Sequence, residues 1–242
     1  MRSTEIPRSK IEGTFRVLVL GDSVPYGGSY IDQEDIFCSV AQVNLQRDNE
    51  NWEILNAGVN AYGPQNVLRY VESKGLFDAD LVIVYLPWGD LYRDFANFYI
   101  VPFWSNSSGY ALEECFRHAV WACFGMLASR WKSTAAFNAD RALDINISAL
   151  ERVQAICQDS GVPVYFFWSP CQSVGHGKLA EPDKNELKLV SERLPKECTV
   201  FVEELFQNRS DIKELYVDAC HYSTKGHRIV GQYLAEFIRN CK

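Results

Sequence analysis

Runs of consecutive apolar residues alternate along this chain with segments in which apolar residues recur every three or four positions. An uninterrupted apolar run of four to eight residues is typical of a strand that is buried on both faces of a parallel sheet. Four such runs and a shorter fifth one predict strands at residues 16–20, 52–55, 81–86, 162–168 and 199–202.

Helical spacing of the apolar residues predicts helices between these strands. The expected helices cover residues 35–46, 64–74, 140–160, part of 178–196, and 224–240. Pro64 suits the first turn of the second helix because a backbone N–H is not needed there, and Gly75 can end it. Repeated strand–helix units predict a three-layer α/β fold with right-handed crossovers.

One domain is expected from residue 16 to residue 242, behind an extended lead-in or linker at residues 1–15. The alternation pauses at about residues 92–137, which hold 12 of the chain's 32 aromatic residues. An insertion of this size needs a small core of its own, and we interpret most of its aromatic residues in that way. Because the insertion follows the third strand directly, we also expect it to shape specificity as a lid or wall. A dimer surface is the alternative.

Composition and charge narrow the classes of partner. The 242 residues carry 24 Lys+Arg against 31 Asp+Glu, a net charge of −7, which argues against nucleic acid as a partner. No stretch reaches the ~18 apolar residues of a membrane span. The first ten residues lack the apolar region of a signal peptide. The protein is therefore either cytoplasmic or extracytoplasmic, with an anchor or signal preceding this chain. Its oligomeric state stays open.

The eight cysteines give no sign of a metal centre or a disulfide scaffold. No Cys-x-x-Cys spacing occurs, so structural zinc and thioredoxin-like redox chemistry both lack their usual signature. We interpret the cysteines as free or buried thiols. An even count would still permit pairing in an oxidising compartment.

Candidate chemistry lies just after the predicted strands, because ligands of open α/β sheets bind beyond the carboxyl ends of the strands. Ser23 follows the first strand and is a candidate nucleophile, which needs a base to take its proton. His221 can supply that base. Asp218, three residues earlier, can hold the imidazole through its other ring nitrogen. These three residues supply the roles of a serine triad, which is recognised by geometry rather than by chain order.

Four blocks of this sequence resemble the SGNH, or GDSL, hydrolase superfamily. They are Val17–Ser23, Asn56–Gly63, Leu81–Asp90 and Asp218–His221. The resemblance spans almost the whole chain apart from the lead-in and the aromatic insertion. It implies a flavodoxin-like α/β/α sandwich with a mostly parallel, five-stranded sheet, and the hydrolysis or transfer of esters through an acyl-serine.

The resemblance also implies site residues. It maps the nucleophile onto Ser23, the base onto His221 and the orienting acid onto Asp218. Backbone N–H groups of Ser23 and Ala61 would stabilise the oxyanion, and Asp90 would hydrogen-bond its loop. No metal and no organic cofactor is required.

Two positions depart from the family pattern. The second-block glycine, an oxyanion donor through its backbone, falls on Ala61, which keeps the N–H. The third-block asparagine, a side-chain donor, falls on Gly89, which has no side chain. Loss of one such donor elsewhere costs ~10²–10³ in rate. The Gly89 backbone, the Trp88 indole N–H or the nearby Asn60 could substitute. Otherwise the enzyme is slow, or the site binds without catalysis.

The sequence therefore predicts a serine-dependent ester hydrolase that acts on short acyl esters, such as an O-acetyl group on a carbohydrate. The rival from another class is a non-catalytic ligand- or glycan-binding domain on the same fold. Among enzymes, an O-acetyltransferase and a lysophospholipase are the alternatives. The small-molecule or carbohydrate ester itself is not specified by the sequence.

Overall fold

The computed structural model describes residues 8–28, 30–46, 51–93, 95, 116, 119–120, 139–173 and 178–242. The predicted aromatic insertion lies almost wholly outside the described residues, as does the first half of the predicted lead-in. Within the described ranges, no helix combines the length and the apolar character needed to cross a membrane.

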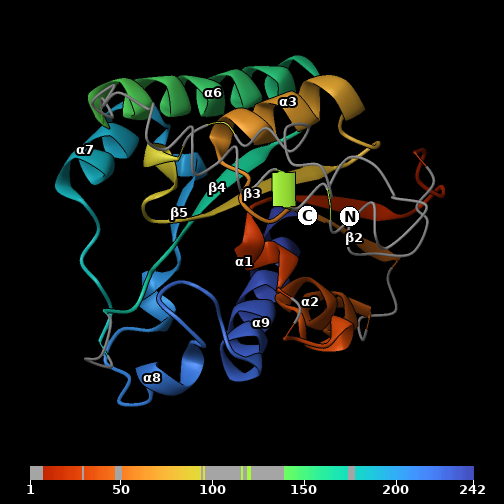
Figure 1. The fold of residues 1–242 in the computed structure, drawn as a ribbon. Helices are drawn as coiled ribbons and strands as arrows, with labels where there is room; N and C mark the ends of the chain where they lie inside the picture. The colour runs from red at the N-terminus through yellow and green to blue at the C-terminus, as the bar shows by residue number, and fades with distance from the viewer. Residues whose placement is uncertain are drawn as a thin grey trace.

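A five-stranded parallel sheet forms the centre of the fold (Figure 1). The strand order is β2-β1-β3-β4-β5, and every neighbouring pair is parallel. The strands are β1 (Phe15–Gly21), β2 (Trp52–Gly58), β3 (Leu81–Pro87), β4 (Val164–Ser169) and β5 (Thr199–Phe201). This arrangement confirms the predicted α/β sandwich, and the sheet is parallel throughout.

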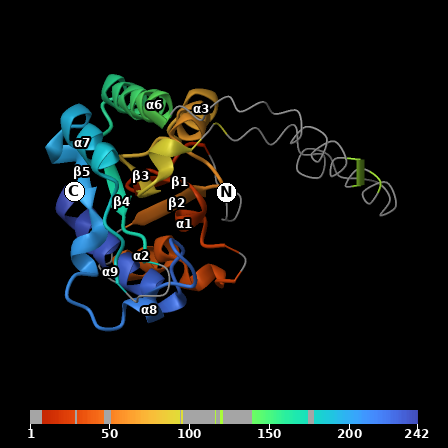
Figure 2. The same cartoon turned by 60° about the vertical axis from the view of Figure 1, so that its left-hand side comes forward.

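Helices cover both faces of the sheet, as the two views show (Figures 1 and 2). One face packs against α2 (Phe37–Gln46) and α9 (Thr224–Cys241), and the other against α3 (Pro64–Lys74), α6 (Ala139–Asp159) and α7 (Lys184–Arg193). Short helical segments fill the connections: α1 (Ser23–Tyr26), α8 (Ile212–Leu215), and the 3₁₀ turns Gln33–Asp35, Asp90–Tyr92, Lys196–Cys198 and Val202–Leu205. Alternate residues of each central strand enter opposite cores because side chains of a strand alternate between its faces.

The second strand is longer than its apolar pattern predicts. Asn56 was expected to follow the strand, but the backbone pairs with β1 as far as Gly58. The buried Asn56 amide is satisfied there: it donates to the Pro25 carbonyl (2.6 Å) and accepts from the Gly58 N–H (2.9 Å). A polar residue with a complete set of partners can thus continue a buried strand, which hydrophobicity alone does not reveal.

Gly21 lets the first strand turn sharply into α1. A Cβ at this position would lie 2.1 Å from the Tyr85 carbonyl oxygen and 2.8 Å from the Pro25 side chain. No larger residue fits against β3 at this point, so a glycine is needed. The turn places the next residues, Asp22 and Ser23, at the carboxyl edge of the sheet between β2 and β3.

Candidate active site

Ser23 is the first residue of α1, and its neighbour Asp22 fixes the turn that presents it. Asp22 is fully buried, and its Oδ1 accepts the Val24 N–H at 2.8 Å as an N-cap. Burial raises the pKa of Asp22, while the hydrogen bond from Val24 and the Arg93 charge act in the opposite direction. The capped turn holds the Ser23 hydroxyl in one place at the sheet edge.

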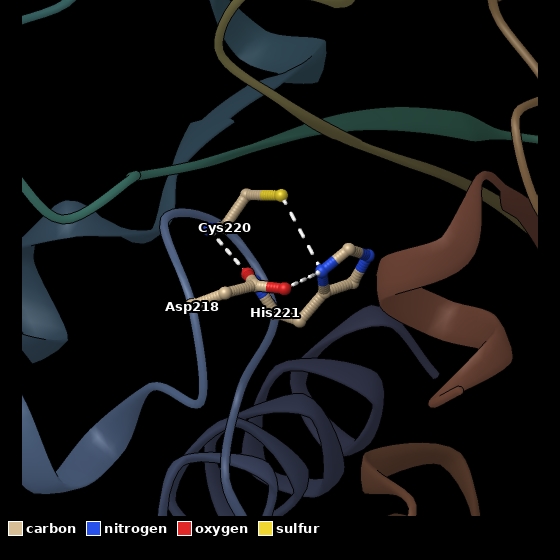
Figure 3. A group of neighbouring side chains, drawn as sticks. All are labelled: Asp218, Cys220 and His221. Atoms are coloured by element: carbon tan, nitrogen blue, oxygen red, sulfur yellow. Dashed lines mark hydrogen bonds and ion pairs between the residues drawn. The ribbon is translucent and has the colours of Figure 1, made fainter. Parts of the chain in front are cut away.

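The structure brings Ser23, His221 and Asp218 together, although 198 positions separate the serine from the histidine. His221 Nε2 lies 2.7 Å from Ser23 Oγ, and His221 Nδ1 lies 2.7 Å from Asp218 Oδ2. Figure 3 shows the Asp218 carboxylate directed at the imidazole. Such a chain can pass a proton from the hydroxyl to the imidazole while the carboxylate holds the required tautomer.

Asp218 is fixed by the backbone of its own turn. Its Oδ1 accepts the N–H groups of Cys220 (3.0 Å) and His221 (2.9 Å), which leaves Oδ2 for the imidazole. Burial raises the pKa of Asp218, but these hydrogen bonds outweigh it, and the pKa lies below its usual value. The group is therefore a carboxylate at neutral pH and accepts the proton on Nδ1, so that Nε2 keeps its lone pair for Ser23.

Tyr222 anchors the turn that carries His221. Its hydroxyl lies 3.0 Å from the Tyr85 hydroxyl and 2.5 Å from Ser169 Oγ, so the turn is tied to the ends of β3 and β4. The Val217 N–H also donates to the His221 carbonyl at 2.9 Å. Because Tyr222 is fully buried, these contacts fix the backbone next to the histidine without touching its ring.

The loop after β3 is held by a carboxylate that sequence analysis missed. Glu186 of α7 is fully buried and accepts the Gly89 N–H through both oxygens (3.0 and 2.8 Å) and the Leu91 N–H at 3.2 Å. The Trp88 indole N–H donates to Glu203 Oε2 at 3.2 Å. Both of these proposed substitutes for the family's asparagine therefore already have acceptors.

The backbone N–H groups of Ser23 and of Ala61, in the loop after β2, have no such acceptor among the described residues. Within the described ranges, neither the Ser23 N–H nor the Ala61 N–H takes part in a hydrogen bond, and Ala61 has a left-handed φ of 63°. The Asn60 Oδ1 atom is buried, and no described residue hydrogen-bonds it. This oxygen is an acceptor and cannot itself stabilise an oxyanion; the donor of the Asn60 side chain is its Nδ2 amide, next to Ala61 in the sequence.

Asp90 and Arg93 connect the loop after β3 to the Ser23 turn. Asp90 is buried and pairs with Arg93 Nη2 at 2.6 Å, and the same nitrogen lies 3.7 Å from Asp22 Oδ2. Burial and the nearby Asp22 raise the pKa of Asp90 well above its usual range. Asp90 was predicted to hydrogen-bond its own loop, and its partner Arg93 lies three residues further along that loop.

The buried Glu186 gives stability an unusual pH dependence. Burial raises its pKa to about 7, despite the opposing hydrogen bonds from Gly89 and Leu91. The unfolded chain protonates this glutamate only near pH 4.3. Between these values the folded state binds the extra proton, so its stabilising effect is present at low pH and is lost as the pH rises towards 7.

We expect the free energy of unfolding of the wild-type protein to fall between pH 4.5 and pH 7.5 by about 2–3 kcal/mol more than that of the Glu186→Gln variant. Denaturant titrations of both proteins across this range measure the difference. Asp183 and Asp90, the other acids that act on this group or its loop, are present in both proteins, so they contribute to both curves, apart from the part of the Asp90 pKa shift that Glu186 itself causes. Parallel curves for the two proteins would contradict this assignment.

No protein-family model and no curated protein matches this sequence. Solved structures do match. An acetyl xylan esterase, AlAXEase, aligns with a TM-score of 0.57 and 15% identity over 93% of this chain and 100% of that one. The lipase/acylhydrolase from Enterococcus faecalis aligns with a TM-score of 0.56 and 13% identity over 93% and 96% of the two chains. A protein of the G-D-S-L family from Desulfitobacterium hafniense DCB-2 aligns with a TM-score of 0.50 and 14% identity over 91% and 98%.

Proposed function

Because this chain has the fold of the SGNH hydrolases, we propose that it is a serine-dependent ester hydrolase acting on short acyl esters through an acyl-serine intermediate. The observation that carries the proposal is the uninterrupted chain of contacts from Ser23 Oγ through His221 to Asp218, with both links at 2.7 Å. Fold alone does not imply function, so the proposal rests on these side chains.

Catalysis would proceed in two halves. In the first, Ser23 Oγ attacks the ester carbonyl as its proton passes to His221 Nε2, and the C–O bond to the alcohol breaks as that proton is transferred to the leaving oxygen. In the second, His221 takes a proton from water as the water oxygen attacks the acyl-serine, and then returns that proton to Ser23 Oγ as the C–Oγ bond breaks and the acid is released. Asp218 stabilises the imidazolium in both halves without becoming protonated.

The oxyanion would be held by the N–H groups of Ser23 and Ala61 and by the side chain of Asn60. The first two take part in no hydrogen bond within the described residues. Gly89 and Trp88 cannot contribute without giving up Glu186 and Glu203. Asn60 is the remaining substitute for the family's asparagine, and its amide lies in the same loop as Ala61. Donors aimed at the developing charge are the largest single contribution in many acyl-transfer enzymes.

A short acyl group, such as an O-acetyl group on a carbohydrate, is the substrate we propose. An acetyl xylan esterase is among the proteins of the same fold. A lipase/acylhydrolase is also among them, so acyl length must be measured directly.

The test combines covalent labelling with a chain-length series. A fluorophosphonate should label the native protein at the peptide containing Ser23, and heat-denatured protein should remain unlabelled. The kcat/KM value for p-nitrophenyl esters should be highest for acetate and fall with each longer chain. Absence of both labelling and turnover would favour a binding domain, and a preference for long chains would favour a lysophospholipase.

A further inference from the structure

Cys220 lies beside the Asp218–His221 pair, and the proposed reaction does not use it. Its Sγ is 3.7 Å from His221 Nδ1, and Figure 3 shows the thiol and the carboxylate approaching the same ring nitrogen. The three ligand atoms offered by Asp218, Cys220 and His221 all lie within 4.8 Å of one another. Sulfur, nitrogen and oxygen donors thus surround one small volume.

We propose that Asp218, Cys220 and His221 bind a zinc ion and that this ion inhibits the enzyme. The inhibitory part rests on the proposed function. Zinc is bound by this donor set, with Zn–S of about 2.3 Å and Zn–N and Zn–O of about 2.0–2.2 Å. Tetrahedral geometry then requires an S···N separation of about 3.5 Å, close to the observed 3.7 Å, and an N···O separation of about 3.3 Å, so the Asp218 carboxylate would move back from its present 2.7 Å contact with Nδ1 as the ion enters. Water would complete the fourth position.

The position of the ligands determines how zinc would act. A metal on His221 Nδ1 needs the lone pair of that nitrogen, so the proton moves to Nε2, while the thiol proton is released to water. The tautomer is then the reverse of the one catalysis requires: Nε2 donates to Ser23 Oγ and can no longer accept its proton. The metal also occupies the carboxylate that would stabilise the imidazolium. Substrate can still reach the site, so inhibition should lower kcat rather than raise KM.

Charge and access both suit a cation. The Asp218 carboxylate is a negative charge beside the Cys220 thiol, and Arg93 is the opposing charge there. About half of the Asp218 side chain is exposed, against a quarter of the His221 side chain. A hydrated ion can therefore meet the carboxylate first and then exchange water for the ring nitrogen and the thiolate.

The experiment uses two metals and two cysteine variants. Co²⁺ binding to the full chain should produce the thiolate-to-cobalt absorption band near 340 nm and tetrahedral d–d bands in the visible region. Both should be lost in Cys220→Ala. Cys241 is a matched control because it is also a partly buried free thiol, but it lies at the end of α9 beside Tyr165, near the start of β4. Cys241→Ala should keep the bands.

Zinc should inhibit p-nitrophenyl acetate hydrolysis through kcat, and EDTA should reverse the inhibition. Each variant is compared with its own metal-free rate. The concentration for half-inhibition should rise at least tenfold in Cys220→Ala and stay within twofold in Cys241→Ala. Absence of the cobalt band, or a band that survives in Cys220→Ala, would overturn the site. If the wild-type chain shows no turnover but the Cys220-dependent band appears, the metal site stands and the proposed function fails.

Discussion

Replacing Ser23 with alanine should reduce ester turnover by about 10⁴–10⁶-fold and abolish fluorophosphonate labelling. Removal of the nucleophile of a triad has effects of this size, because the base and the acid have nothing left to activate. Ser23 Oγ is 2.7 Å from His221 Nε2, so its hydroxyl is the one that the imidazole can deprotonate. The measurement is kcat/KM for p-nitrophenyl acetate, with the uncatalysed rate subtracted.

Stability should barely change in this variant, which separates a chemical effect from a folding effect. Ser23 Oγ hydrogen-bonds Asp22 Oδ2 at 3.2 Å, but Asp22 Oδ1 and the Val24 N–H form the cap that holds the turn. Ser73→Ala is a matched control, since this exposed serine hydrogen-bonds the Tyr70 carbonyl within α3. Both variants should unfold within about 1 kcal/mol of the wild type. Equal rates in Ser23→Ala and the wild type would rule out the acyl-serine route.

The same reasoning predicts the size of the loss when His221 or Asp218 is replaced. His221→Ala should match Ser23→Ala, and the double variant should lose no more than either single one, because the residues act as a unit. Asp218→Asn should cost less, up to about 10⁴-fold, because it leaves the base in place but favours the wrong tautomer. If the losses in rate were independent and additive, the 2.7 Å contacts among Ser23, His221 and Asp218 would not be those of a catalytic triad.

The central strands could be predicted because β1 and β3 are buried on both faces, and their residues apart from Arg16 and Gly21 are apolar for that reason. The repeated strand–helix units predicted the three-layer α/β class, and the flavodoxin-like arrangement of the sheet was implied by the resemblance. The prediction failed where a polar residue continues a strand, as at Asn56, since hydrogen-bond partners from distant positions decide such cases. The short helices α1 and α8 carry too few residues to show a helical period.

Ser23, Asp218 and His221 could be identified from the sequence because Ser23 follows the first strand and the other two form a recognisable block before the last helix. The residues that hold the loops could not. Glu186 belongs to a charged stretch and follows the exposed N-cap Asp183, so nothing in its neighbourhood signals burial. Its role depends on contact with Gly89, 97 positions away. Tyr222 is likewise defined by hydroxyl partners on two other strands.

Glu186 also shows why the departure at Gly89 cannot be compensated locally. The carboxylate needs the Gly89 and Leu91 N–H groups, because burying it without them would leave a charge unsatisfied. If the Gly89 N–H turned towards the substrate, the acid would lose its closest donor. We therefore expect this oxyanion contact to come from another loop, and the loop after β2 carries the Asn60 amide next to the Ala61 N–H, which takes part in no hydrogen bond within the described residues.

Replacing Asn60 with alanine should accordingly lower kcat by about 10²–10³-fold with little change in KM, since an oxyanion donor acts on the transition state and not on the bound ester. Asn60→Asp should fall at least as far, because it has nearly the same shape but offers a negative charge where a donor is needed. Asn51→Ala is a matched control: this asparagine is exposed and precedes the opposite end of β2. Its rate should equal that of the wild type.

A second substitution, Gly89→Asn, tests whether a side-chain amide at the family's position can replace that of Asn60. A Cβ built on Gly89 meets no atom within 4 Å, so an asparagine fits there in space, although its φ of 99° costs about 1–2 kcal/mol of stability. In the Asn60→Ala background, Gly89→Asn should recover at least tenfold in kcat, because it returns a side-chain amide to the position that the family uses. An unchanged rate in Asn60→Ala would contradict the assignment of Asn60. A deficient rate without recovery in the double variant would show instead that the Gly89 position does not face the oxyanion in this protein.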